Sequence, residues 1–171
     1  QAAEKGRWAR GDLPELAPRS LAGATVAVVG LGVIGTRMSQ VLSSFGANVV
    51  GVDPVVTVPG VPLVPLTQAL RADALTLHCS LAPSSENLID ARALAQMCSH
   101  AVLVNTARGG NLDVAAAVEA VRIGRLRGVA VDVFPEEPYP ALAAGGQVPG
   151  VWFTPHAAGF THDLGTRVAE G

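Results

Sequence analysis

A short apolar run that leads straight into three spaced glycines constrains the fold of this chain most. Residues 25–30 read Thr-Val-Ala-Val-Val-Gly, a continuous β-branched run typical of a strand buried on both faces of a parallel sheet. Gly30, Gly32 and Gly35 form a Gly-x-Gly-x-x-Gly turn, and a helical pattern follows it. Gly46 lies where such a helix would end, because glycine accepts the left-handed conformation found there. A strand, a glycine-rich turn and a helix in this order predict the first unit of an α/β fold.

Strands and helices continue to alternate through the rest of the chain. Apolar runs predict strands at residues 48–52, 74–79, 101–105, 128–133 and 151–154. The intervening segments predict helices at residues 66–71, 90–97 and 113–123. Asp90 is placed to cap the second of these helices, and the prolines between residues 54 and 65 predict a loop. Strands that alternate with helices pair in parallel through right-handed crossovers, so we predict an α/β fold with a Rossmann-type, doubly wound parallel sheet.

Size and composition fit a single domain. The chain has 171 residues, of which 49% are hydrophobic and 15% are charged. That apolar content is enough for a substantial core, and it excludes a disordered chain. Residues 1–22 are polar and interrupted by Pro14 and Pro18, so we expect a connecting arm there and the domain itself at residues 23–171.

Charge and cysteine content exclude several classes of function. The formal net charge of −2 argues against nucleic acid or an anionic membrane as the main partner. No apolar tract approaches the roughly 20 residues that a membrane helix needs. Cys79 and Cys98 stand apart with no histidine cluster around them, so neither a metal site nor a disulfide is expected. We expect a protein of the reducing cytoplasm.

The glycine turn has the context of a dinucleotide site. It follows a predicted strand and opens a predicted helix, and Asp53 ends the next strand 18 positions after Gly35. In such a site Gly30 makes the tight turn, Gly32 lets the backbone approach the diphosphate, and Gly35 lets helix and strand pack closely. The N-terminus of the helix offers unpaired N–H groups to the phosphates. A turn with no ligand is the alternative.

Asp53 is the residue expected to select the cofactor. A carboxylate at this position accepts hydrogen bonds from the adenosine ribose and repels a 2′-phosphate, so we expect NAD rather than NADP. No arginine follows directly to receive a phosphate. The alternative interpretation is a turn residue at the end of a strand, before Pro54.

Four blocks in the second half of the chain carry a resemblance to a known family. They are Leu-His-Cys-Ser-Leu at 77–81, Asn-Thr-Ala-Arg-Gly-Gly-Asn-Leu-Asp at 105–113, Val-Asp-Val-Phe-Pro-Glu-Glu-Pro at 131–138 and Thr-Pro-His-Ala-Ala-Gly at 154–159. In this order after the glycine turn, they resemble the D-isomer-specific 2-hydroxyacid dehydrogenases, and within them the phosphoglycerate dehydrogenase-like members. The resemblance runs from about Arg7 to the C-terminus.

The resemblance implies three catalytic residues. Arg108 would hold the substrate carboxylate with its guanidinium fork and polarise the neighbouring carbonyl group. His156 would act as general acid or base, and Glu137 would hold its ring in one tautomer. Glu137 rather than the adjacent Glu136 fits the Glu-Pro pair of the family.

The resemblance also implies a set of cofactor contacts. Asp132 would bind the nicotinamide carboxamide, and the main chain at Thr106 would help to orient it. The full predicted set is Gly30, Gly32, Val33, Ile34, Gly35, Asp53, Cys79, Thr106, Ala107, Arg108, Asp132, His156, Ala157, Ala158 and Gly159. A small buried apolar side chain is an equal alternative for Cys79. We interpret His78 as structural, and His100 and His162 as surface residues.

The resemblance implies that this chain is half of an enzyme. Family members carry a further substrate-binding domain, and their active site lies between the two domains. We therefore expect an NAD-binding domain that has little or no activity alone, from an enzyme acting on a 2-hydroxy or 2-keto acid such as 3-phosphoglycerate. Relatives usually dimerise through this domain, which makes a homodimer the candidate assembly, and the residues themselves leave the oligomeric state open.

Two other functions remain open on the same residues. An NAD-sensing interaction module, like the family's transcriptional corepressor relatives, would retain the same motifs. A phosphite-oxidising dehydrogenase on the same scaffold is also compatible with them, whereas Glu137 argues against a formate dehydrogenase, which differs at that position. A turnover assay on the complete protein would discriminate these functions.

Overall fold

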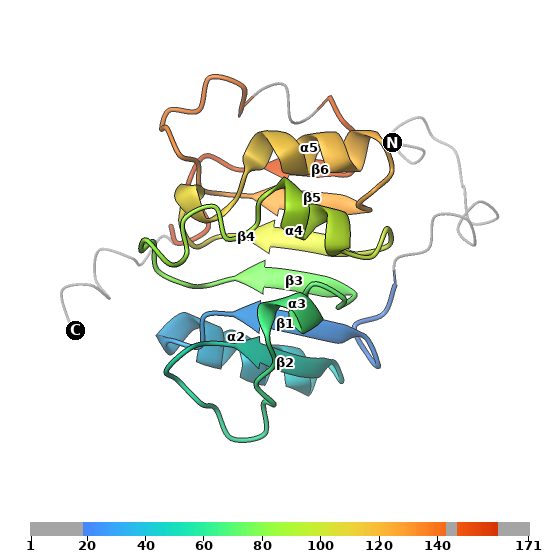
Figure 1. The fold of residues 1–171 in the computed structure, drawn as a ribbon, viewed down its shortest axis with the longest axis vertical. Helices are drawn as coiled ribbons and strands as arrows, with labels where there is room; N and C mark the ends of the chain where they lie inside the picture. Colours follow the sequence, from blue (N-terminus) through green and yellow to red (C-terminus); the bar gives the residue numbers. More distant parts are fainter. Residues whose placement is uncertain (1–18, 143–146, 161–171) are drawn as a thin grey trace.

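The computed structural model describes residues 19–142 and 147–160, which form one parallel sheet with helices packed on it (Figure 1). The six strands lie in the order β2-β1-β3-β4-β5-β6, and every neighbouring pair is parallel. Their bounds are β1 Thr25–Val29, β2 Asn48–Val52, β3 Ala74–Leu77, β4 Val102–Asn105, β5 Gly128–Val131 and β6 Val151–Phe153. The predicted α/β class and parallel sheet are confirmed; β2 has the predicted bounds, and β3 to β6 are one or two residues shorter than expected.

The helices cover the two faces of the sheet unequally. In the described residues they are α2 Val33–Ser44, α3 Leu66–Ala69, α4 Ala91–Gln96 and α5 Val114–Arg122, and a 3₁₀ turn, η2, spans Gly109–Asn111. Asp90 caps α4, as predicted, by accepting a hydrogen bond from the N–H of Ala93 at 2.8 Å. Figure 1 shows α2 on one side of the sheet and α4 and α5 on the other. Among the described residues, none of these helices is long and apolar enough to cross a membrane.

Alternating side chains of each strand supply the two halves of the core. Ala27 and Val29 of β1 belong to the larger cluster, which joins the central strands to α4 and α5. Val28 lies on the opposite face and packs in a smaller cluster with Leu31 and Val49. Because both faces of the central strands are apolar, these strands are continuous hydrophobic runs rather than alternating ones.

The chain reverses its direction across the sheet at β1, between β2 and β3. From β1 the chain goes to β2 on one side, and later returns to β3 on the other side. Gly30, which directly follows β1, has φ of +88°, and a Cβ there would lie 2.5 Å from the backbone nitrogen of Cys79. Ligands of open α/β sheets bind at such a switch point.

The proline-rich segment after β2 is more ordered than the predicted loop. The Gly51 N–H donates to the Pro62 carbonyl and the Val64 N–H donates to the Gly51 carbonyl, both at 2.9 Å, which makes a parallel bridge between Gly51 and Leu63. The predicted loop is confirmed, since no helix or named strand forms at residues 54–65, but isolated bridges order it. Pro62 and Pro65 have no N–H to donate, so the pairing does not extend into a full strand.

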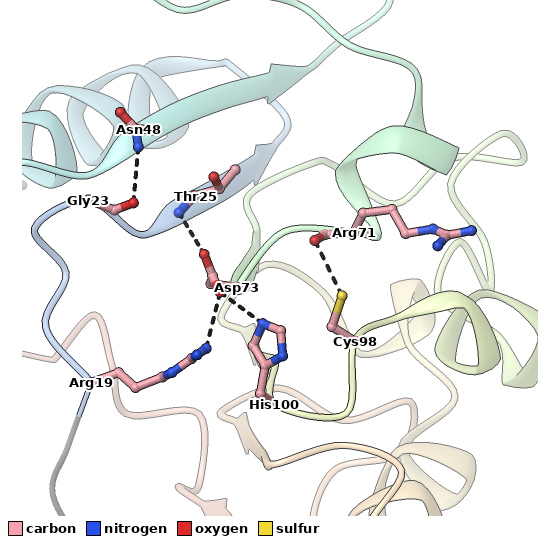
Figure 2. A network of polar contacts seen from close by, with 8 residues as sticks. All are labelled: Arg19, Gly23, Thr25, Asn48, Arg71, Asp73, Cys98 and His100. Atoms are coloured by element: carbon pink, nitrogen blue, oxygen red, sulfur yellow. Dashed lines mark hydrogen bonds and ion pairs between the residues drawn. The ribbon is translucent and has the colours of Figure 1, made fainter.

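A polar cluster centred on Asp73 holds the opposite, amino-terminal edge of the sheet together (Figure 2). The Asp73 carboxylate accepts hydrogen bonds from the Thr25 N–H at 2.9 Å and from Arg19 at 3.1 Å, and it contacts Nε2 of His100 at 2.8 Å. His100 is therefore a partly buried partner of Asp73 rather than a free surface residue. Most of the predicted connecting arm, and His162, lie outside the described residues.

We expect Asp73→Ala to lower the free energy of unfolding by about 1–2 kcal/mol, because it removes a charge-assisted hydrogen bond to β1. That bond from Thr25 is the largest cause of the lowered pKa of Asp73, and His100 and Arg19 add to it. A lowered pKa means that the contribution is full above the ordinary carboxyl pKa of about 4 and is lost as the pH falls below it. Urea unfolding at about pH 6 and about pH 3 measures this. The gap between parent and variant should shrink at the lower pH; a gap that widens there contradicts the assignment.

Candidate active site

The residues singled out in the sequence gather along one edge of the sheet. All strands are parallel, so their carboxyl ends lie at the same edge. In spatial order the segments that follow the strand ends carry Asp53 after β2, Gly30 after β1, Cys79 after β3, Thr106–Arg108 after β4, Asp132 after β5 and His156 after β6. The row begins beside the glycine turn and ends at the Glu137–His156 pair.

The glycine turn leaves the start of α2 open. Gly32 caps the helix without any side-chain hydrogen bond, and the first turn contains no acidic residue. A Cβ at Gly32 would meet nothing within 4 Å, whereas a Cβ at Gly35 would overlap the carbonyl oxygen of Gly30. Val33 and Ile34 expose 74% and 66% of their surface at this point. Free N–H groups in an open, uncharged turn fit the diphosphate of a dinucleotide.

Asp53 connects β2 to the glycine turn. Its Oδ2 accepts a hydrogen bond from the Leu31 N–H at 2.7 Å, and its Oδ1 accepts bonds from the N–H groups of Val55 and Val56. Burial raises the pKa of Asp53, but the three backbone donors outweigh it, and the net pKa lies below the ordinary value. A carboxylate has about four lone-pair positions, so Oδ2 can accept one more hydrogen bond. Asp53 therefore does hold the turn at the end of the strand. Its hydrogen bond to the adenosine ribose stays a prediction, which the remaining lone pair permits.

Asp132 fixes the loop that carries the catalytic histidine candidate. Only 4% of its surface is exposed. Its carboxylate accepts hydrogen bonds from the Thr154 hydroxyl and from the N–H groups of Ala157 at 2.8 Å and Ala158 at 3.0 Å. Burial raises the pKa of Asp132, and these three donors lower it further than burial raises it. In this structure Asp132 organises the loop, and its contact with a carboxamide stays a prediction.

Glu137 and His156 form the pair that the sequence predicts. Oε2 of Glu137 lies 2.8 Å from Nδ1 of His156, and Oε1 accepts a hydrogen bond from the Phe134 N–H at 2.9 Å. The hydrogen bond with His156 is the largest cause of the lowered pKa of Glu137, followed by the bond from Phe134. Nε2 of the ring takes no part in this contact.

The backbone of His156 has an uncommon conformation. Its φ is +54°, in the left-handed region, and its N–H donates to the Asp132 carbonyl at 2.7 Å. Histidine tolerates this region better than most residues do, and such conformations concentrate at functional sites. Asp132 thus holds both the start of this loop and the residues after it.

Arg108 lies on a loop built by a buried asparagine. Asn105, which is 0% exposed, accepts a hydrogen bond from the Ala107 N–H and donates one to the Arg108 carbonyl, both at 3.0 Å. The Arg108 guanidinium is exposed and donates to the Ala107 carbonyl at 2.6 Å. A Cβ at Gly109 would overlap the backbone of Phe134, so the Arg108 loop packs directly against the segment that leads to Glu137.

Comparison with known proteins identifies the family. The family described as "D-isomer specific 2-hydroxyacid dehydrogenase, NAD binding domain" matches residues 1–158. The chain belongs to this family. The resemblance on the four sequence blocks is thereby confirmed, as are the Rossmann-type fold and NAD as the cofactor of the domain.

Relatives of this NAD-binding domain include several named dehydrogenases. D-3-phosphoglycerate dehydrogenase of Methanocaldococcus jannaschii is 37% identical over 98% of this chain and 33% of its own length. (S)-sulfolactate dehydrogenase of Chromohalobacter salexigens is 35% identical over 96% of this chain and 54% of its own. The NAD complex of a formate dehydrogenase from Staphylococcus aureus superposes with a TM-score of 0.89 at 29% identity, covering 99% of this chain and 53% of that one. The chain therefore spans about a third to about half the length of these relatives.

Several contributors to the site of this NAD-binding domain were not predicted. Thr154, Asn105 and Phe134 each hold a predicted site residue in place. Asn105 had a usable signal, because a polar residue closes an otherwise apolar strand run.

Burial is the main cause of a raised pKa for the Cys79 thiol, and the nearby charge of Asp53 raises it further. A neutral, half-buried thiol agrees with the apolar alternative, and the cofactor contact of Cys79 stays a prediction.

Proposed function

We propose that the protein carrying this chain is an NAD-dependent dehydrogenase that interconverts D-2-hydroxy acids and 2-keto acids. The observation that carries this proposal is the arrangement of one strand-end row, with an open glycine turn near one end and the 2.8 Å contact of Glu137 with His156 at the other. The comparisons favour this function over a corepressor-like module or a phosphite dehydrogenase.

Each catalytic candidate has a role that its surroundings support. The Arg108 guanidinium can bind a substrate carboxylate through two parallel hydrogen bonds. In the reduction, His156 gives a proton from Nε2 to the carbonyl oxygen; in the oxidation, it takes the hydroxyl proton. Glu137 accepts the Nδ1–H of the ring and so keeps Nε2 directed to the substrate. NAD, when bound, accepts or supplies the hydride.

The proposal extends to the organisation of the whole protein. Residues 1–22 are assigned to a connecting arm and residues 23–171 to the NAD-binding domain, with the substrate domain elsewhere in the protein. The Asp53 carboxylate is assigned to the adenosine ribose, and Asp132 and the Thr106 main chain to the nicotinamide side. A homodimer in the cytoplasm acting on 3-phosphoglycerate or a related acid is the form we propose.

Turnover by the complete protein tests the proposed function. NADH oxidation would be followed with a panel of 2-keto acids, which includes the 2-keto acid formed when 3-phosphoglycerate is oxidised. NAD reduction would be followed with phosphite as the substrate. We expect NADH-dependent reduction of at least one 2-keto acid and no reaction with phosphite. A protein that binds NADH but turns over none of these acids would overturn the proposal in favour of an NAD-sensing module.

A further inference from the structure

The contact between Glu137 and His156 is short, although both side chains are too exposed for their mutual attraction alone to hold them together. The two side chains expose 37% and 53% of their surface. Exposed charged pairs gain little free energy from contact, and long side chains lose conformational entropy when they are fixed. The 2.8 Å separation must therefore depend on how the two backbone segments below the pair are held.

Three aromatic rings join these two segments. Phe134 and Tyr139 stack, with ring centroids 4.3 Å apart and an angle of 12° between the ring planes. Phe153 meets both rings edge-on, at 5.2 Å from Phe134 and 5.9 Å from Tyr139. Stacked and edge-to-face pairs at such distances stabilise by about 0.5–1.5 kcal/mol each, beyond the effect of burial. We call these three residues the aromatic triad.

The members of the aromatic triad flank the pair along the chain. Phe134 donates its N–H to Glu137, and Tyr139 lies two residues after Glu137. Phe153 ends β6, three residues before His156. The triad therefore fixes both ends of the Glu137 segment to the strand that leads into the His156 loop.

We propose that Tyr139 and Phe153 are positioning residues, which set the separation between Glu137 and His156 through ring contact. This proposal rests on the proposed function only for what the pair does, and the geometry stands without it. Phe134 contributes through its backbone as well, because it also packs against Gly109 beside Arg108. The triad thus connects all three catalytic candidates to one aromatic cluster, in which Phe134 is buried and Tyr139 and Phe153 are partly buried against the core.

The pKa of Glu137 reports the geometry directly. It is lowered first by the hydrogen bond to His156 and then by the bond from Phe134, while burial and the charge of Asp132 raise it. A merely destabilised fold leaves these contacts intact in the folded molecules. A triad that no longer aligns the segments lengthens the contact with His156 and lets the pKa of Glu137 rise.

The test follows the side-chain carboxyl carbon of Glu137 by carbon NMR in a pH titration of the 171-residue chain. Tyr139→Leu, Phe153→Leu and Phe153→Met remove a ring, and Tyr139→Phe keeps it. Trp152→Leu removes the exposed neighbouring ring of β6, and Leu94→Ala destabilises the distant core at α4. His156→Ala gives the upper limit of the pKa rise.

We expect the pKa of Glu137 to rise toward the His156→Ala limit in the folded variants that lack a triad ring. Tyr139→Phe, Trp152→Leu and Leu94→Ala should keep the parent pKa, even though Leu94→Ala lowers the Tm. A parent-like pKa of Glu137 in any folded variant that lacks a triad ring would overturn the proposal. Phe153→Met is a second variant at this position, with an unbranched, flexible side chain that adapts to the space the ring leaves. Failure of the proposed function would appear separately, as absent turnover by the complete protein while the pKa of Glu137 in the parent is still lower than in His156→Ala.

Discussion

Replacing His156 with alanine in the complete protein is expected to lower kcat by about 10²–10⁴-fold, the usual effect of removing a general acid or base. The reason is that Nε2 of this ring is the group proposed to exchange a proton with the substrate, while Nδ1 contacts Glu137 at 2.8 Å. Because the φ of His156 is +54°, alanine adds backbone strain there, so His156→Asn, which tolerates that region, should be measured beside it. Both variants should lose kcat alike.

His100 provides a matched control for this prediction. It too contacts a carboxylate at 2.8 Å, with a side chain that is 42% exposed against 53% for His156. It lies at the amino-terminal edge of the sheet, away from the strand-end row. His100→Ala should keep kcat within a few-fold of the parent. A His156→Asn variant with parent-like kcat would remove His156 from its proposed role.

Alanine substitutions at two glycines of the same turn are expected to affect different properties, stability at Gly35 and NADH binding at Gly32. A Cβ at Gly35 would overlap the backbone carbonyl of Gly30, so Gly35→Ala should lower the free energy of unfolding by about 3 kcal/mol or more. A Cβ at Gly32 would meet nothing within 4 Å, and Gly32 has φ of −60°, so Gly32→Ala should fold as stably as the parent. That methyl group would occupy the space proposed for the diphosphate, and should weaken NADH binding at least tenfold.

Thermal unfolding and NADH titration of both variants check this pair. The informative variant is Gly32→Ala, because it is expected to keep the stability of the parent while its NADH affinity falls. Gly124→Ala serves as a control, since its Cβ also meets nothing within 4 Å but it lies beyond α5, outside the strand-end row. Gly124 has φ of +72°, so its own cost should appear in stability and not in binding. Unchanged NADH affinity in Gly32→Ala would show that the cofactor does not approach this turn.

The fold was predictable because its strands are continuous apolar runs with clear ends. Asp90 and Gly46 marked helix boundaries correctly: Asp90 caps α4, and Gly46 has φ of +80° just after α2. Less predictable was the bridge between Gly51 and Leu63, since prolines suggested a loop and only tertiary contact with β2 orders the segment. The pairing of His100 was not predictable for the same reason, because its partner Asp73 lies 27 residues away.

The residues of the candidate site were predictable from the sequence, but the residues that hold them in place were not. Resemblance to a family marks Glu137 and His156, and their contact follows from the fold. The roles of Thr154 and Phe134 depend on contacts between segments that are distant in sequence, and no local pattern carries that information. Asp132 shows the limit most clearly: its carboxylate serves the His156 loop, a role that only the three-dimensional arrangement reveals.

The most direct test of the central claim is calorimetric titration of the 171-residue chain with NADH and with NADPH, in the parent, Asp53→Ala and Asp73→Ala. We predict that the parent binds NADH more tightly than NADPH, and that Asp53→Ala weakens NADH by about 1–3 kcal/mol without weakening NADPH. Asp73 likewise accepts a hydrogen bond from a backbone N–H, that of Thr25 in β1, but it lies at the other edge of the sheet, so Asp73→Ala should bind like the parent. Equal loss of both cofactors would mean that Asp53 only shapes the turn. Equal affinity of the parent for NADH and NADPH, or binding of neither, would contradict the account.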